Sequence, residues 1–321
     1  MRIVKSALAA LAMLAATAGA AAAFPDRPVT IIVPWAAGGG ADTVTRYVAQ
    51  GLEQELGVPV NVVNRTGGGG LTGHTAIATA SPDGYTLGVA SPELSFYKAL
   101  GLGELTPDSL DLFSRVALIP AGLTVKADSP WPTLDSLISD LKAKPKGTFT
   151  SSGTGTGGSW HIALGGLLKA AGLEVDRVRW VPSQGGAPAL QDLAAGGITM
   201  FTGSPVEAKA MLDAGRARTL AIMADARSGS FPGVPTLKEN KIDWTYQNWF
   251  ALVAPKGVPA DRRAELADAL KRAMARADVQ DGLRGRGIQP VWDEPGIFAE
   301  YLKGFVARGE AVLTDLGLAK R

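Results

Sequence analysis

The chain has 321 residues with nearly balanced charge, 32 Lys and Arg against 30 Asp and Glu, and it contains no cysteine. A chain without cysteine has no disulfide, no lipidated N-terminal cysteine and no Cys-ligated metal site. The charge lacks the basic surplus that nucleic-acid binding requires, and the length is sufficient for two lobes with sizeable cores.

The first 23 residues show the pattern of a cleavable secretory signal. Arg2 and Lys5 are followed by an apolar segment at 7–18 and by three alanines at 21–23. The apolar segment is shorter than the roughly 20 residues of a membrane-spanning helix, which is the alternative interpretation. We therefore predict cleavage before Phe24, which removes the two basic residues, and export to the periplasm of a Gram-negative bacterium.

Apolar patterns alternate between strand-like and helix-like spacing from residue 29 onward. A first series predicts strands at 29–33, 58–63 and 85–90 and helices at 42–56 and 71–80. A second series predicts strands at 148–151, 177–181, 198–202 and 218–223, with helices at 133–143, 159–171, 187–195 and 206–214. A strand at 249–254 and helices at 260–277 and 298–316 follow. Strands separated by short helices favour parallel pairing with helices on both faces, so we predict an α/β fold.

The two series indicate two lobes joined by two crossings, near Leu123 to Asp128 and near Trp249 to Ala254. We place residues 24–125 and 251–321 in lobe 1 and residues 126–250 in lobe 2. The C-terminal helices are expected to return to lobe 1.

Two glycine-rich loops, one in each lobe, each follow a strand and open a helix. The first contains Gly38-Gly39-Gly40, and the second runs from Ser152 to Gly158. Glycine lets the backbone approach a ligand closely, and a helix start offers unpaired N–H groups and a partial positive charge. The loops therefore predict one anion site on each lobe, with the ligand held between them. A simple helix cap is the alternative role of the first loop.

Several short motifs occur in a fixed order along nearly the whole chain after residue 23. They are Phe24-Pro25-Asp26-Arg27-Pro28-Val29, Val33-Pro34-Trp35 with the first glycine loop, Val60-Asn61-Val62-Val63-Asn64-Arg65 with the glycines at 67–70, Ser81-Pro82-Asp83-Gly84-Tyr85-Thr86-Leu87, Ser151-Ser152-Gly153 with Gly155 and His161, Val181-Pro182-Ser183 with the segment 185–190, Pro232-Gly233-Val234-Pro235-Thr236-Leu237, and Ala254-Pro255. Together they resemble the periplasmic receptors of tripartite tricarboxylate transporters, the Bug receptor family.

The resemblance implies a type II periplasmic-binding-protein fold, in which two lobes close over a ligand. It also implies carboxylate ligands, held largely through backbone and ordered water in the loops after the first strands of each lobe. Gln247-Asn248-Trp249 and the long loop before His161 are similar to the tricarboxylate-receptor branch of the family. The Arg-Gly that tends to follow Asn-Trp in that branch is replaced here by Phe250-Ala251, which removes a potential contact for a third carboxylate.

The residues expected to contact ligand lie in the two glycine loops and in the loops beside them. They are Trp35, Ala36, Ala37, Gly38, Gly39, Gly40, Gly68, Gly69, Ser91, Ser152, Gly153, Thr154, Gly155, Thr156, Trp160, Gln184, Gly186 and Ser204. Trp35 and Trp160 are expected either to line the cleft and stack on a ligand or to pack within their own loops. Asp42 is expected to form an intrahelical ion pair with Arg46. No cofactor, metal or catalytic residue is expected.

We predict a receptor that captures a small di- or tricarboxylate and delivers it to a permease with one large and one small membrane subunit. It is expected to be a monomer without a nucleic-acid partner. One alternative is an exported hydrolase that uses His161, although no G-x-S-x-G motif is present. Another is a ligand sensor that partners a two-component kinase. A third is dinucleotide binding, because residues 153–158 match G-x-G-x-x-G and Asp176 follows 18 residues later.

Overall fold

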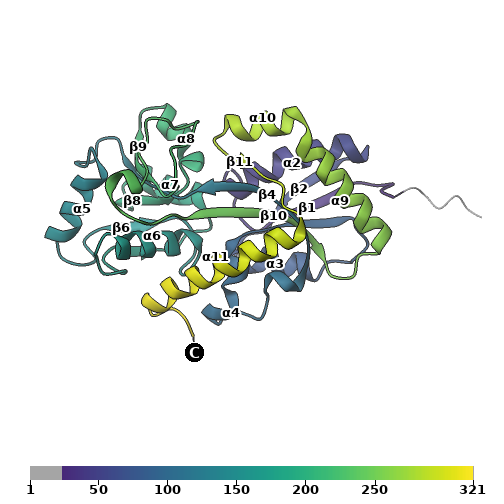
Figure 1. Ribbon diagram of the computed structural model, residues 1–321, viewed down its shortest axis with the longest axis horizontal. Coiled ribbons are helices and arrows are strands. Elements are labelled where there is room, and N and C mark those ends of the chain that lie inside the picture. The colour runs from purple at the N-terminus through teal and green to yellow at the C-terminus, as the bar shows by residue number, and fades with distance from the viewer. Residues whose placement is uncertain (1–23, 321) are drawn as a thin grey trace, which may run out of the picture.

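Two β-sheets organise the chain in the computed structural model, which describes residues 24–320 (Figure 1). The predicted signal peptide, residues 1–23, lies outside the described residues. The first sheet has the order β11 (Gln289–Pro290), β4 (Leu110–Pro120), β10 (Gln247–Pro255), β3 (Thr86–Ala90), β1 (Val29–Val33) and β2 (Val60–Asn64). The second has the order β7 (Arg179–Val181), β6 (Thr150–Ser152), β8 (Met200–Gly203), β5 (Gly122–Lys126) and β9 (Ala217–Ile222).

Both sheets mix parallel and antiparallel pairs. β1 pairs in parallel with β2 and β3, and β6 pairs in parallel with β7 and β8. These are the strands that the alternating pattern predicted, and the two-lobe α/β fold is confirmed. The strands beside the crossings are antiparallel instead, because β10 runs against β3 and β4, and β5 runs against β8 and β9. The sequence pattern did not indicate this part of the pairing.

Helices cover the faces of both sheets (Figure 1). The first sheet contacts α2 (Gly40–Leu56) and α3 (Leu71–Ala78), and the second contacts α6 (Ser159–Ala170), α7 (Gly186–Ala195) and α8 (Pro205–Asp213). The remaining helices are α4 (Tyr97–Leu100), α5 (Leu134–Ala143), α9 (Ala260–Ala275), α10 (Ala277–Gly285) and α11 (Pro295–Asp315). No helix among residues 24–320 is long and apolar enough to cross a membrane.

The two connections between the sheets lie side by side and are hydrogen-bonded to each other. The amide of Ala121, between β4 and β5, donates to the carbonyl of Tyr246 at 2.9 Å, and Tyr246 in turn donates to Met223 at 2.8 Å. The chain therefore passes between the sheets at residue 121 and again in the segment that ends at residue 246, each a few residues before the segment in which a crossing was predicted. The division of the chain into lobes at residues 125 and 250 stays a prediction.

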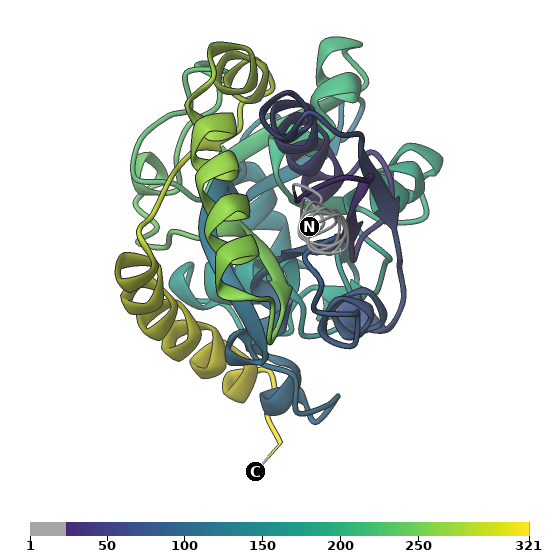
Figure 2. The same ribbon diagram turned by 90° about the vertical axis from the view of Figure 1, so that its right-hand side faces the viewer.

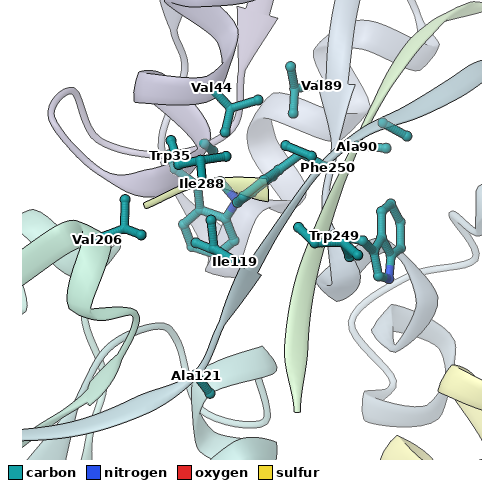
Figure 3. Close-up of a cluster of buried hydrophobic side chains, with 14 of the residues drawn as sticks. Trp35, Val44, Val89, Ala90, Ile119, Ala121, Val206, Trp249, Phe250 and Ile288 are labelled. Atoms are coloured by element: carbon teal, nitrogen blue, oxygen red, sulfur yellow. The ribbon is translucent and has the colours of Figure 1, made fainter. Parts of the chain in front are cut away.

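A continuous apolar core runs through the junction of the sheets. Trp35, Ile119 and Phe250 belong to it and are almost fully buried, with Val206 of the second lobe beside them (Figure 3). Strand β1 is apolar and buried at every position except Thr30, rather than strictly alternating, since it is interior in the sheet and covered by α2 and α3. The first glycine loop therefore starts from a rigid strand.

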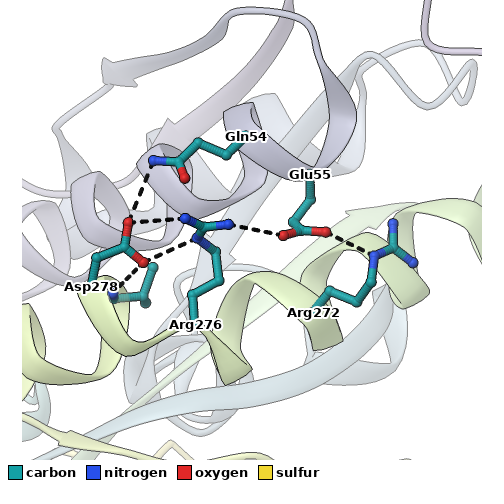
Figure 4. Close-up of polar contacts among 6 residues, drawn as sticks. Gln54, Glu55, Arg272, Arg276 and Asp278 are labelled. Carbon is teal, nitrogen blue, oxygen red and sulfur yellow. Dashed lines mark hydrogen bonds and ion pairs between the residues drawn. The ribbon is translucent and has the colours of Figure 1, made fainter.

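The helices α9 and α10 pack on α2, beside the first sheet. Glu55 on α2 pairs with Arg272 at 2.8 Å and with Arg276 at 3.2 Å (Figure 4). Arg276 also pairs with Asp278 at 3.0 Å, and Gln54 donates to the same carboxylate. The expected single helix at 260–277 is interrupted between residues 275 and 277, where Arg276 takes an extended conformation.

The last helix, α11, contacts both lobes. It packs on β4 of the first sheet and on α6 of the second lobe, and it lies along one side of the molecule (Figures 1 and 2). Its Phe298 meets Trp249 of β10 edge to face, with ring centroids 5.2 Å apart. Its other end meets Gly165 of α6, where a Cβ would lie 2.8 Å from Val312. From the sequence, this helix was expected to pack on lobe 1 only, and its contact with α6 was not predicted.

Gly51 is the residue that lets α2 approach α9 and α10. A Cβ on Gly51 would lie 2.7 Å from Cγ2 of Val279 and 3.1 Å from Cβ of Ala273. We expect Gly51→Leu to lower the free energy of unfolding by about 1–3 kcal/mol through overpacking, despite the better helix propensity of leucine. Urea denaturation measures it, with Gln50→Leu, on the exposed side of α2, as the control. Equal stability of the two variants would contradict this packing.

Candidate ligand-binding site

A small pocket lies between the two lobes, at the carboxyl ends of their parallel strands. Its free volume is about 20 Å³, enough for about one water molecule. The first lobe, the second lobe and strand β10 all contribute to its lining: Trp35, Ala36, Gly39, Gly40, Ala41, Glu93, Thr154, Trp160, Gly185, Gly186, Glu207, Asn248 and Phe250. In open α/β sheets this edge is the usual position of a ligand site.

Two of the three glycine N–H groups of the first loop are bonded to side chains of the protein, and that of Gly39 is bonded to the carbonyl of Ala36. The amide of Gly38 donates to Asp42 at 2.9 Å, and that of Gly40, at the start of α2, donates to Glu207 at 3.2 Å. Asp42 also pairs with Arg46 at 2.9 Å, as predicted. The acceptor at Gly40 comes from α8 of the opposite lobe.

The second glycine loop shows the same arrangement from the other side. The amide of Gly157 donates to Nδ1 of His161 at 3.0 Å. The amide of Ser159, at the start of α6, donates to Glu93 at 2.9 Å. Glu93 belongs to the first lobe, in the 3-10 helix Pro92–Ser95 that follows β3. Each lobe therefore places a carboxylate on the helix start of the other lobe.

The carboxylate of Glu93 is fixed by a short hydrogen-bond chain within the first lobe. Ser91 donates its hydroxyl to Glu93 at 2.8 Å, and the indole of Trp35 donates to Ser91 at 3.0 Å. All three side chains are buried. The chain orients Glu93 toward α6.

The carboxylate of Glu207 is positioned by a capping box at the start of α8. The amide of Ser204 donates to Glu207 at 3.0 Å, while the Ser204 hydroxyl accepts from the amide of Val206. The carboxylate also lies against the first residue of α7, where a Cβ on Gly186 would be 2.3 Å from its Oε1. A glycine at 186 is therefore required for Glu207 to reach Gly40.

Burial disfavours the charged form of both carboxyl groups. It raises the pKa of Glu93, and it raises the pKa of Glu207 to about 7. Hydrogen bonds from Ser204 and Gly40 act in the opposite direction on Glu207, and the nearby Glu93 raises its pKa further. The pocket thus already holds two acidic groups that resist simultaneous ionisation.

Two further polar side chains of the lining have no protein partner within the described residues. They are the hydroxyl of Thr154 and the amide oxygen of Asn248, both almost fully buried. No lysine, arginine or histidine of residues 24–320 lines the pocket, whereas three aromatic side chains do. A buried polar atom without a partner is costly, so these two groups are available for a ligand or water.

The structure brings seven of the predicted site residues to the pocket: Trp35, Ala36, Gly39, Gly40, Thr154, Trp160 and Gly186. It places Ser91 and Ser204 behind the lining, where they hold Glu93 and Glu207. The loops of Gly69 and Gly155 approach each other, since a Cβ on Gly155 would lie 3.2 Å from Cα of Gly69. The others are outside the lining: Ser152 and Gly153 are buried at the end of β6, and Ala37, Gly38, Gly68, Thr156 and Gln184 are exposed.

Sequence reasoning missed the two carboxylates. Glu207 is part of a recognisable local motif, the Ser204-x-x-Glu207 capping box. Such a motif is fully accounted for by hydrogen bonds at the start of its own helix, so it does not indicate a contact with the other lobe. Glu93 follows a strand at the edge where ligands bind, yet one acidic residue at that position is a weak signal. Asn248 and Phe250 were singled out only through the family resemblance.

The geometry does not favour the alternative functions. His161 accepts from a backbone amide rather than a serine, its ring stacks on Trp180 at 4.6 Å, and burial lowers its pKa to about 4. Asp176, the candidate ribose-binding acid, pairs with Lys146 at 2.7 Å and is not part of the lining. No group of three or more His, Asp or Glu side chains within 24–320 is arranged to hold a metal ion.

Comparison with known proteins gives one consistent family. Residues 44–318 match the model of the tripartite tricarboxylate transporter family receptor. The chain is 31% identical to Protein BugT of Bordetella pertussis, over 97% of each chain. It is similar in structure to MatC of Rhodopseudomonas palustris with bound malate (29% identity, TM-score 0.80, covering 90% of this chain and 100% of that one). It is also similar to R. palustris Rpa4515 with adipate (25% identity, TM-score 0.82, covering 92% and 99%).

The pKa of Glu207 leads to a pH-dependent stability that Glu207→Gln should remove. Between pH 4.5 and about 7 the folded protein holds a proton that the unfolded chain has lost, so this group's contribution to stability falls as the pH rises. We expect the difference in unfolding free energy, wild type minus variant, to decrease by up to about 1.4 kcal/mol per pH unit in that window.

Urea titrations of both proteins from pH 5 to pH 8 measure this difference. Contributions from Glu93, His74 and His161 are present in both proteins, so the subtraction cancels them to first order. A difference that is independent of pH would mean that the Glu207 carboxyl is hydrated in solution.

Proposed function

The chain belongs to the family of tripartite tricarboxylate transporter receptors, and we propose that it captures a small carboxylate between its lobes and delivers it to the transporter's permease. The family consists of solute-binding receptors, which sets aside the hydrolase hypothesis. Receptors of this family are periplasmic. Export through the predicted signal peptide, with the mature chain starting at Phe24 and acting as a monomer, is part of the proposal.

The observation that carries the proposal is the pocket built from both lobes and from a strand that connects them. Its lining follows the ends of β1, β3, β6, β7 and β8 and includes the start of β10, so a bound solute would contact both lobes and this strand. The structures with malate and adipate have the same fold at TM-scores of 0.80 and 0.82. They support a carboxylate as the ligand.

Capture requires the lobes to separate. A free volume of about 20 Å³ admits water but not a solute of the size of malate. The paired connections at Ala121 and Tyr246 are the place where such a rotation would occur, because they are where the described chain passes from one sheet to the other. Trp35 and Trp160 lie in the moving walls, so their fluorescence would report on binding.

A retained or added ligand tests the proposal directly. Native mass spectrometry of protein purified from periplasm without refolding should show a small organic acid, and calorimetry with a panel of mono-, di- and tricarboxylates should show binding at one site per chain. The intact mass should correspond to a chain that starts at Phe24. Binding of a neutral sugar with no response to any carboxylate would remove the proposed solute class.

The contact between Gly155 and Gly69 makes closure sensitive to a side chain at position 155. A Cβ there would lie 3.2 Å from Cα of Gly69 in the opposite lobe. We expect Gly155→Leu to hold the lobes apart and weaken binding of the solute identified above by about ten-fold or more, equivalent to about 1.4 kcal/mol.

Small-angle scattering should show a larger radius of gyration for this variant than for wild type at saturating solute. Gly229→Leu serves as the control, because Gly229 is exposed with no atom within 4 Å of its Cβ position. An unchanged radius together with unchanged affinity would contradict closure through this contact.

A further inference from the structure

The charge of the pocket is opposite to what a dianionic ligand needs. Glu93 and Glu207 line it, the amide oxygen of Asn248 is without a partner, and no basic side chain of the described residues is present. Two more carboxylates would be brought beside two buried acidic groups. Like charges in a poorly hydrated site repel strongly, because the low local dielectric weakens screening.

The positions that would otherwise receive ligand carboxylates are taken by the protein's own. The amide of Gly40 at the start of α2 is bonded to Glu207, and the amide of Ser159 at the start of α6 is bonded to Glu93. A dicarboxylate would have to displace both side chains into a space with no cation to receive them. A ligand with a single carboxylate would not have to displace both glutamates. Its carboxylate could accept a hydrogen bond from the buried hydroxyl of Thr154, which has no partner within the described chain.

The remaining lining is suited to a positive group. Trp35, Trp160 and Phe250 line the same pocket as the two carboxylates, and aromatic faces attract cations when both are desolvated. Carboxylates beside aromatic rings form the kind of environment that a protonated nitrogen occupies favourably. An ammonium between Glu93 and Glu207 would also relieve their mutual repulsion.

We infer that Glu93 and Glu207 set the charge of the ligand, so that the pocket takes a small zwitterion, with one carboxylate and one protonated nitrogen, in preference to a dicarboxylate. This rests on the proposed function and narrows its solute class from the di- or tricarboxylates that the sequence predicted. The protonated nitrogen contacts the two carboxylates, and the single carboxylate lies on the side of Thr154.

Matched pairs of solutes test the inference by changing only one end of the ligand. Succinate is compared with β-alanine, glutarate with γ-aminobutyrate, and adipate with δ-aminovalerate, each pair sharing its spacer. Calorimetry is performed on wild type, Glu93→Gln, Glu207→Gln and Asp213→Asn. Asp213 is exposed on the same helix as Glu207 and pairs with Lys209, so its variant controls for loss of one negative charge.

Wild type and Asp213→Asn should bind the amino member of at least one pair more tightly than its diacid. Each glutamine variant should lose roughly 10- to 100-fold in affinity for the amino member, while its affinity for the diacid rises. Thermal unfolding without solute establishes that the variants are folded. A purely structural role of the two carboxylates would weaken both members of a pair equally.

Tighter binding of the diacid by wild type in every pair that binds would overturn the inference and leave the proposed function standing, as would equal losses for both members of a pair in the glutamine variants. Binding of no member of any pair, with no organic acid retained through purification, would count against the proposed function itself. The two failures are therefore distinguishable.

Discussion

The N–H groups at a helix start must have acceptors when another part of the protein covers them. In this protein the helix starts of α2 and α6 both border the small pocket between the lobes, whose free volume of about 20 Å³ leaves little room for water. Each is satisfied by a glutamate that the opposite lobe provides, Glu207 for α2 and Glu93 for α6. The contact between the lobes, the use of glycine and the acidic character of the pocket all depend on this exchange.

The exchange of glutamates between the lobes explains why two positions at helix starts are glycine although no ligand is needed to account for them. Gly186 is a helical residue whose conformation any amino acid could adopt, yet a Cβ would collide with the Glu207 carboxylate. Gly40 is likewise confined by Ile119, at 2.7 Å from its Cβ position. Glycine at these two positions allows other groups of the protein to pack closely against the backbone, just as it would allow a ligand to do so. A sequence rich in glycine at such a position therefore indicates a crowded helix start without specifying what lies on it.

The fold could be predicted from the sequence because its signals are local. Apolar periodicity located β1 to β3 and the helices between them, and the glycine motifs marked the loops that form the pocket walls. Antiparallel pairing of β4 with β10 could not be predicted in this way, since it depends on residues more than a hundred positions apart. The roles of Glu93 and Glu207 could not be predicted for the same reason, because their backbone partners lie 66 and 167 positions away in the sequence.

The C-terminal helix gives the molecule a third mechanical connection besides the paired strands. One end of α11 is anchored by Phe298 on Trp249 in the first sheet, and Asp315 near the other end pairs with Lys169 of α6. When one lobe rotates, α11 cannot keep both attachments unchanged, so its outer surface and that of α6 shift relative to each other. Under the proposed capture mechanism, a change in the angle between the lobes would therefore change the outer surface that α11 and α6 form together, and a permease would meet a different surface in the open and closed states.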